Sequence, residues 1–263
     1  MTSILRKRLG KFPWMRARPV VVAVAPAVVV VACLLQPAPA AAQATQSVRS
    51  VEVSAELLAS TDYRFRGYSR SDGKPTLQAR LDATVETRNG FSLFAGIEPS
   101  IFPANRRYGG SEADFYAGLE SEVGAVHVTG GVRTRLFLGR TSRNYVELFG
   151  SGRMSYGPLS GKLGFTVAPG TSDYGDRRGL YVFSDFDAGF PGTPITLAAH
   201  LGRETAANEP EKIDWSLSAT YVLSPVDISV SYVDTNRFLT FDAAPRPRNR
   251  AGGALVVALR GSF

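Results

Sequence analysis

Apolar and polar residues alternate without interruption over residues 77–86, LQARLDATVE. Successive side chains of a β-strand point to opposite faces of a sheet, so this period of two predicts a strand with one apolar and one polar face. Two kinds of protein use such a strand. A soluble sheet packs the apolar face on a core, whereas an outer-membrane barrel turns that face toward lipid and the polar face toward a lumen.

The same alternation recurs along the chain after residue 50, and no stretch there keeps the period of an amphipathic helix. A tilted strand needs roughly 9 to 11 residues to cross a bilayer, and most of these segments have about that length. The third and the ninth are the shortest. We therefore predict about twelve strands, over residues 51–62, 76–87, 91–97, 113–123, 126–137, 145–156, 159–167, 180–190, 195–202, 213–223, 226–234 and 251–263.

The connections between these segments alternate in length. Five are tight and built from turn-forming residues: RNG from Arg88, GA from Gly124, GP from Gly157, PGTP from Pro191 and SP from Ser224. The connections between them are longer and polar. A barrel with short periplasmic turns and long extracellular loops has this rhythm when both termini are periplasmic. The pattern therefore favours an all-β fold: a single up-and-down antiparallel transmembrane barrel of the outer-membrane type.

Large aromatic residues on the apolar face lie near the ends of the predicted strands, and smaller apolar residues fill the middle. Transmembrane barrels have such aromatic girdles at both membrane interfaces. A general preference of aromatics for strands would not confine them to one face. We expect the girdles at Phe115, Phe165, Trp215 and Tyr232 toward the outside, and at Phe91, Tyr156, Phe190, Tyr221 and Phe263 toward the periplasm.

The polar face holds too many charges for a dry core, because a buried charge is stable only when it is paired or hydrated. A hydrated, salt-bridged lumen accommodates them. The candidates to line it are Arg80, Asp82, Glu86, Asp114, Glu120, Arg133, Arg135, Glu147, Arg153, Lys162, Asp185 and Asp187.

The first 44 residues have the features of a cleaved signal peptide: a basic start, an apolar run over residues 19–35, and cleavage sites after Ala42 or Ala44. Pro26 and the short run argue against a transmembrane anchor. Leucines directly after the single cysteine, Cys33, argue against a lipid anchor. We predict that residues 1–44 are removed and that residues 45–263 form one barrel domain without disulfides.

The charge balance changes once the signal peptide is set aside. The chain has 30 Lys and Arg residues against 23 Asp and Glu, and six of the basic residues precede residue 44, which leaves 24 against 23. This balance gives no support for a nucleic-acid partner. Basic residues nevertheless gather in the long connections, where they either attract anionic solutes or bind lipopolysaccharide phosphates: Arg64, Arg66, Arg70, Arg246, Arg248 and Arg250.

Three functional classes fit such a barrel. A porin-like channel needs only a lumen and its charges. A closed structural or adhesive barrel is the second, since twelve strands lie between small filled barrels and larger porins with an aqueous channel. A lipid hydrolase is the third and least favoured, because its nucleophile needs a nearby base, and the only histidines, His127 and His200, face the lumen. We expect no catalytic residues, no cofactor and no metal site.

Residues 61–82, TDYRFRGYSRSDGKPTLQARLD, resemble the TorF family of porin-like outer-membrane proteins, a conserved bacterial family of unknown function. That family typically has Asp-Tyr-x-Phe-Arg-Gly, then Ser-x-x-Asp-Gly-x-Pro and an alternating strand. The likeness continues through DFYAGLESEVG, NYVELFGSGRMSYGPLSGKLGF, DWSLSATYVL and SYVDTN, and departs at TGGVRTRLFLGR, where the family has a tyrosine-rich strand. The resemblance implies an outer-membrane barrel with a pore role and supplies no substrate.

The sequence thus predicts a barrel in the outer membrane of a Gram-negative bacterium, acting as a porin-like channel for passive or selective diffusion of small hydrophilic solutes. Its expected partners are outer-membrane lipid and lipopolysaccharide, those solutes, and the barrel-assembly machinery. The terminal residue of the last strand, Phe263, is an outward-facing aromatic of the kind that serves as the assembly signal.

Overall fold

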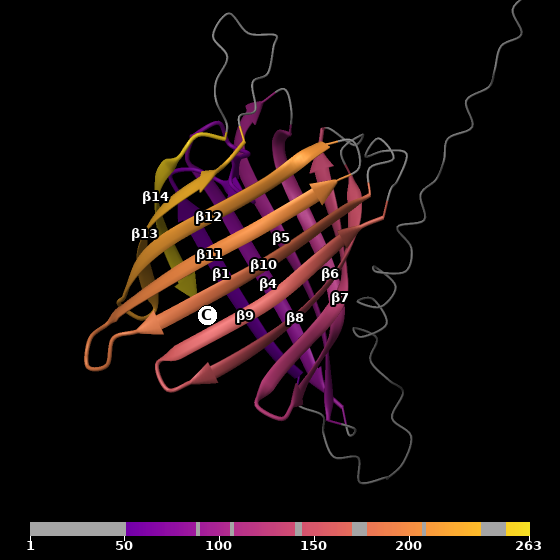
Figure 1. Ribbon diagram of the computed structural model, residues 1–263, viewed down its shortest axis with the longest axis vertical. Coiled ribbons are helices and arrows are strands. Elements are labelled where there is room, and N and C mark those ends of the chain that lie inside the picture. The colour runs from indigo at the N-terminus through magenta and orange to yellow at the C-terminus, as the bar shows by residue number, and fades with distance from the viewer. Residues whose placement is uncertain are drawn as a thin grey trace, which may run out of the picture. The chain divides into compact units, whose positions relative to one another are not determined.

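The computed structural model describes residues 51–87, 90–105, 108–139, 144–169, 178–206, 209–237 and 251–263. The predicted signal peptide lies outside these residues. The described residues form twelve barrel strands and one short hairpin, β2 and β3 (Figure 1). The barrel strands are β1 (Val51–Ser60), β4 (Thr76–Glu86), β5 (Phe91–Asn105), β6 (Gly109–Val123), β7 (Val126–Leu138), β8 (Tyr145–Tyr156), β9 (Leu159–Ala168), β10 (Gly179–Gly189), β11 (Ile195–Ala206), β12 (Glu209–Val222), β13 (Val226–Thr235) and β14 (Ala254–Ser262).

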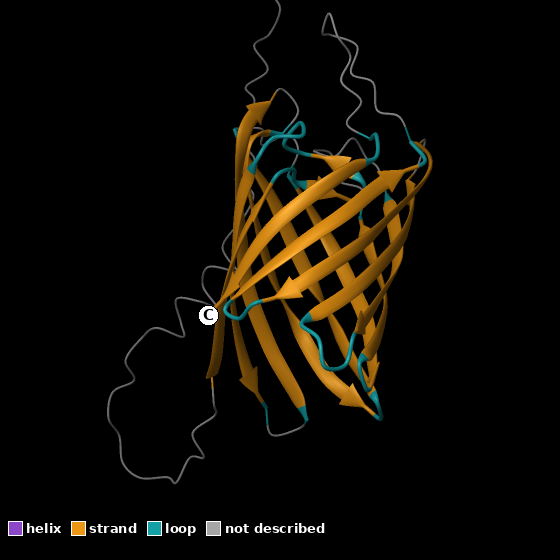
Figure 2. Cartoon of the chain, turned by 90° about the vertical axis from the view of Figure 1, so that its left-hand side faces the viewer, coloured by secondary structure: helices purple, strands orange, loops and turns teal. Residues whose placement is uncertain are grey.

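Each barrel strand pairs antiparallel with the barrel strands that precede and follow it, which gives the barrel seen from the side in Figure 2. β14 pairs with β1 to close the sheet. The closing register places Glu56 opposite Ser262 and Ser60 opposite Ala258. Beyond β14, the backbone of Phe263 exchanges hydrogen bonds with Ala55, at 2.9 and 3.0 Å. The predicted fold, a twelve-stranded up-and-down antiparallel barrel, is confirmed.

The alternation over residues 77–86 determines which side of β4 is the outside. Leu77 and Leu81 are 51% and 49% exposed on the outer surface, whereas Gln78, between them, is only 8% exposed on the inner one. The other barrel strands follow the same rule, so the outer surface is a continuous apolar belt. Soluble proteins rarely expose contiguous apolar patches of more than a few hundred Å², so a belt around the whole barrel fits contact with lipid.

Most of the aromatic residues expected in the two girdles are exposed on the outer surface. Tyr156, at the end of β8, is 85% exposed, and Phe263 is 73% exposed. Phe91, the first residue of β5, is 50% exposed, whereas Phe115 is only partly exposed. No helix among the described residues is long and apolar enough to cross a membrane.

Two connections predicted to be long are continuations of strands. β5 extends to Asn105 and β6 begins at Gly109, and β11 extends to Ala206 before β12 begins at Glu209. Strand β5 was predicted to end at residue 97, yet the alternation continues past Pro99 and Pro103. Ser100 and Phe102 are buried on the inner side, and Ile101, between them, is 64% exposed outside. Pro99 retains its place opposite Ala113 of β6, and that ladder becomes irregular between Ile101 and Asn105. On the other side of β5, the pairing with β4 is interrupted between Ile97 and Ser100.

The apolar belt gives a test of membrane exposure. Leu163 lies in the middle of β9 and is 70% exposed, whereas Val51, which is 60% exposed, begins β1 at the rim. Arginine in the middle of a bilayer costs about 2–4 kcal/mol, but roughly 0–1 kcal/mol near the interface. Leu163→Arg is expected to lower the free energy of unfolding in lipid vesicles by that larger amount, measured by urea titration, and Val51→Arg by the smaller one. Equal losses for both variants would contradict the assignment of Leu163 to the lipid-facing middle of the barrel.

Candidate functional site in the barrel lumen

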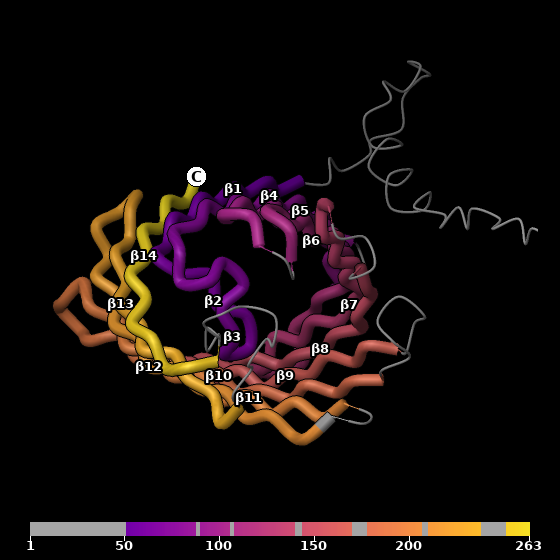
Figure 3. The backbone as a smooth tube through the Cα atoms, turned by 90° about the horizontal axis from the view of Figure 1, so that it is seen from above, coloured from indigo at the N-terminus to yellow at the C-terminus, as the bar shows by residue number. Residues whose placement is uncertain are grey.

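The first long connection, residues 61–75, folds into the barrel and is called the inward hairpin below. Its short strands β2 (Arg64–Phe65) and β3 (Tyr68–Ser69) lie inside the ring of barrel strands (Figure 3). The turn between them consists of Arg66 and Gly67, with φ of +48° and +81°. Two central residues with positive φ define the tight turn whose twist matches a β-hairpin. The connection is therefore an ordered part of the lumen.

Asp62 holds the base of the inward hairpin together. Its buried carboxylate accepts hydrogen bonds from Arg64 Nε at 2.5 Å, Ser69 Oγ at 2.5 Å, Ser71 Oγ at 2.9 Å and the backbone N–H of Gly73 at 3.2 Å. A buried carboxylate is stable only when it is fully hydrogen-bonded or paired. The residues of the Asp-Tyr-x-Phe-Arg-Gly and Ser-x-x-Asp-Gly segments therefore form one folded unit.

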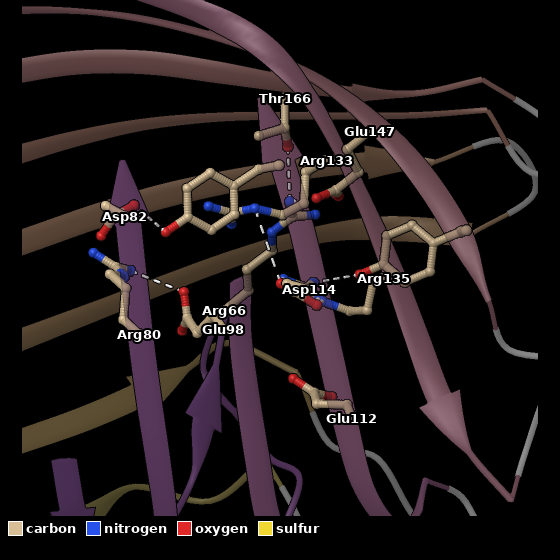
Figure 4. A network of polar contacts seen from close by, with 12 residues as sticks. Arg66, Arg80, Asp82, Glu98, Glu112, Asp114, Arg133, Arg135, Glu147 and Thr166 are labelled. Atoms are coloured by element: carbon tan, nitrogen blue, oxygen red, sulfur yellow. Dashed lines mark hydrogen bonds and ion pairs between the residues drawn. The ribbon is translucent and has the colours of Figure 1, made fainter. Parts of the chain in front are cut away.

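Arg66 fixes the tip of the inward hairpin to three strands of the wall. Its guanidinium donates to Glu147 of β8 at 2.6 Å, Thr166 of β9 at 2.7 Å and Glu204 of β11 at 2.9 Å (Figure 4 shows the first two partners). Lys212 donates to the backbone oxygen of Arg66 at 2.9 Å. Burial alone would lower the pKa of Arg66, but Glu147 and Glu204 outweigh it and raise that pKa. These contacts offset the cost of a non-glycine residue in the left-handed region.

Arg70 and Phe65 fill the lumen beside the tip. Arg70 pairs with Glu112 of β6, at 2.5 and 2.6 Å to its two carboxylate oxygens, and Tyr63 donates a hydrogen bond to Glu112 as well. The Phe65 ring lies 3.8 Å from the guanidinium carbon of Arg70 and 4.2 Å from that of Arg135. Both cations therefore contact an aromatic ring and also have acidic partners.

Arg135 of β7 lies at the same level of the lumen as Phe65 and Arg70. It pairs with Asp114, with Arg135 Nε 2.7 Å from Asp114 Oδ1, and donates to Tyr145 at 2.6 Å. Arg135, Asp114, Glu112 and Glu147 are each no more than 3% exposed. At the level of the inward hairpin, the lumen is thus filled by cations paired with carboxylates.

The structure therefore places Arg64, Arg66 and Arg70 differently from the expectation of an outward-facing basic loop. They lie in the lumen because Asp62, Glu112, Glu147 and Glu204 supply the carboxylates that these guanidiniums need. The many acids on the predicted inner face of the strands were a partial indication that these arginines could lie inside the barrel. Arg246, Arg248 and Arg250 lie outside the described residues.

Next to the inward hairpin the lumen contains a cavity of about 590 Å³. Five of the predicted pore-lining residues surround it: Arg133, Glu147, Arg153, Lys162 and Asp185. Aromatic rings of Phe65, Phe149, Tyr181 and Phe183 complete much of the wall. The cavity combines cations with rings in a way that the sequence pattern alone did not reveal.

The other predicted lumen residues lie elsewhere on the inner wall. Asp114 and Arg135 are buried beside the inward hairpin, and Arg80 pairs with Glu98 at 2.9 Å while Asp82 accepts from Tyr116 at 2.5 Å (Figure 4). Asp187 is 3.5 Å from Arg153. Glu86 and Glu120, near the short turns, have partly or fully exposed side chains.

Both histidines face the lumen and contact carboxylates through both ring nitrogens. His200 lies 2.6 Å from Asp185 and 3.2 Å from Asp214. His127 lies 2.8 Å from Glu122 and 3.5 Å from Glu120. Among the residues that the structure describes, no cluster of three or more acidic, histidine or cysteine side chains is arranged to hold a metal ion.

Comparison with known proteins gives a family and a fold. Residues 42–263 match the family model Gcw_chp, described as a bacterial protein of unknown function. The structure is similar to the KdgM porin in complex with disordered oligogalacturonate, with a TM-score of 0.51, 13% identity, and 80% of this chain and 99% of that chain covered. It is also similar to the NanC porin, with a TM-score of 0.50, 10% identity and 80% and 98% coverage. No curated protein matches the sequence.

The tip of the inward hairpin gives a test of its docking. A Cβ added to Gly67 would lie 2.9 Å from the Cβ atoms of Asp214 and Thr235, whereas one added to Gly73, which also has positive φ, would meet nothing within 4 Å. Left-handed backbone costs an alanine roughly 1–2 kcal/mol. Gly73→Ala is expected to lose about that amount of unfolding free energy and Gly67→Ala at least about 1 kcal/mol more because of the clash. Urea titration of the refolded variants measures both; equal losses would contradict docking of the tip on the wall.

Proposed function

The chain belongs to the Gcw_chp family of bacterial proteins of unknown function, and we propose that its barrel is a porin-like channel for small hydrophilic solutes. The observation that carries the proposal is the cavity, lined by charged side chains and aromatic rings, inside a closed barrel whose outer surface is apolar. Water and polar solutes do not enter an apolar core favourably, whereas the charged and hydroxyl groups of this lumen can form hydrogen bonds with them. The resemblance to the TorF family and the fold shared with two porins support the same proposal.

The inward hairpin is the constriction in this proposal. It carries Phe65 and Arg66 to the wall of the cavity and holds them there through buried ion pairs. A solute that crosses the barrel has to pass beside these residues. The same packing supports the second candidate, a closed structural or adhesive barrel, because the buried layer around Arg70 and Arg135 leaves little space at that level.

The proposal extends to the surroundings of the barrel. We place it in the outer membrane, after export with the signal peptide of residues 1–44, with lipid and lipopolysaccharide around the apolar belt. Phe263 is proposed as the signal for the barrel-assembly machinery, and its exposed position on the outer surface leaves the side chain accessible. The function needs neither a cofactor nor catalysis. Arg246, Arg248 and Arg250 remain candidates for contact with lipopolysaccharide or with entering anions.

Planar-bilayer recordings of the refolded full chain test the channel directly. The wild type is expected to conduct, and Arg66→Ala is expected to conduct more, because breaking a buried ion pair costs about 3–5 kcal/mol and frees the hairpin tip from Glu147 and Glu204. Arg203→Ala is the matched control, since Arg203 pairs with Glu211 at 2.7 Å on the exposed rim. Its conductance is expected to equal that of the wild type.

Two results would decide against the proposal. If neither the wild type nor Arg66→Ala conducts at any voltage, the closed structural barrel is favoured. An equal rise in conductance for Arg66→Ala and Arg203→Ala would show that the inward hairpin is not the constriction. Heat-dependent mobility on gels verifies that each variant is folded before it is recorded.

A further inference from the structure

The cations of the lumen fall into two groups that differ in their partners. Beside the inward hairpin, Arg66, Arg70 and Arg135 are held by carboxylates at short distance. In the cavity, Lys162 and Arg133 are held mainly by aromatic rings. We propose that these ring-held cations form a binding site for a small organic carboxylate with a ring-shaped skeleton, such as a sugar acid. This proposal rests on the proposed function, because it takes such a carboxylate to be a solute that the channel admits.

Lys162, on β9, lies opposite Asp185 of β10 in the sheet register. Asp185, however, is occupied by His200 at 2.6 Å, and Lys162 makes no ion pair with any of the described residues. Its Nζ atom lies 5.4 Å from the centre of the Phe183 ring. A ring attracts a cation without cancelling its charge, so the ammonium remains able to pair with an anion.

Arg133, on β7, is in a similar position. Its nearest acid is Asp114, at 3.9 Å, and that carboxylate is already held by Arg135. The guanidinium carbon of Arg133 lies 5.2 Å from the centre of the Tyr116 ring and 5.8 Å from that of Phe149. Its Nε atom is buried without a hydrogen-bond partner among the described residues. An unsatisfied buried N–H on a charged group is costly, and a bound carboxylate would remove that cost.

Arg153, opposite Lys162 on β8, is a further cation of the cavity, beside the carboxylate-bound Arg66. The Nη1 atom of Arg153 donates to Ser160 Oγ at 3.2 Å and lies 3.5 Å from Asp187, and the Arg153 side chain is 45% exposed. The two acids that line the cavity, Glu147 and Asp185, are already paired with Arg66 and His200. The cavity therefore has an excess of positive charge that is not neutralised within it.

The wall also limits the kind of anion. A cavity of about 590 Å³ lies within the usual size of small-molecule sites, roughly 300–1,000 Å³. Phe149 and Phe183 offer apolar faces on which a ring can stack, while Thr129 and Ser151 offer hydroxyl groups. A carboxylate accepts hydrogen bonds from a guanidinium in a matching planar geometry. These features together favour an organic anion with a carboxylate and a ring over a simple inorganic ion.

Equilibrium binding to the refolded full chain in detergent tests the site without requiring conduction. Isothermal titration calorimetry with glucuronate, and with glucose as the neutral counterpart, is expected to show binding of glucuronate alone. Lys162→Gln and Arg133→Gln are each expected to weaken that binding by at least about tenfold, since each removes one charge-assisted contact. Arg80→Gln is the matched control. It removes the same charge from the lumen wall, but Arg80 pairs with Glu98 and lies outside the cavity lining, so binding is expected to persist.

Three results would overturn the site: equal binding of glucuronate and glucose, equal weakening by Lys162→Gln and Arg80→Gln, or displacement of glucuronate by chloride at the same concentration as by glucuronate itself. The binding result is separable from the channel result. A barrel that binds glucuronate but does not conduct supports the site and refutes the channel. A barrel that conducts but does not bind glucuronate retains the channel and refutes the site.

Discussion

Closure of the sheet between β1 and β14 is the constraint on which the rest of this structure depends. A strand inside a bilayer can satisfy its backbone groups only through neighbouring strands, so a membrane-spanning sheet must have no free edge. Closure divides every strand into an outer and an inner face. The outer face consists mainly of apolar side chains, and most charges of the barrel strands are consequently directed into a lumen of limited width; Arg203 and Glu211, at the exposed rim, are exceptions. Once the charges are there, each has to be paired, hydrated or held by other polarisable groups.

The inward hairpin supplies cations to the acids that face the lumen at its own level. Glu112, Glu147 and Glu204 come from three different strands. Glu204 also pairs with Lys212 of β12 at 2.5 Å, whereas the cations that pair with the other two come from the inward hairpin. Arg66 and Arg70 reach them from a segment outside the barrel strands. Buried ion pairs add little net stability, because desolvation cancels most of their attraction. Their effect here is to specify one position for the hairpin: if it were displaced, several charges would remain buried and unpaired.

The sequence predicts the barrel well because its pattern reflects one dominant rule, that apolar side chains face lipid. Leu77 and Leu81 lie outside and Gln78 inside, as the alternation requires. The strand predicted over residues 91–97 was too short, because the alternation of β5 continues past Pro99 and Pro103, a residue type that is uncommon at ladder positions. The inward hairpin could not be predicted, because periodicity describes a strand and not the direction of a loop. Arg66 and its partners Glu147 and Glu204 are 81 and 138 residues apart in the chain, and only the closed sheet brings them together.

The charge of the cavity also follows from the way in which the inner-face acids are paired. On the inner face, the cations of the inward hairpin, His200 and Arg135 already pair with the nearby acids. Lys162 and Arg133 are left with mainly aromatic neighbours. A ring lowers the energy of a nearby cation by much less than a carboxylate does, and it leaves the net charge unchanged. The hairpin therefore affects the lumen in two ways: it narrows the barrel, and by occupying carboxylates it leaves the adjacent cavity positively charged. A change at Arg66 alters both effects together, because Arg66 binds Glu147, which lines the cavity.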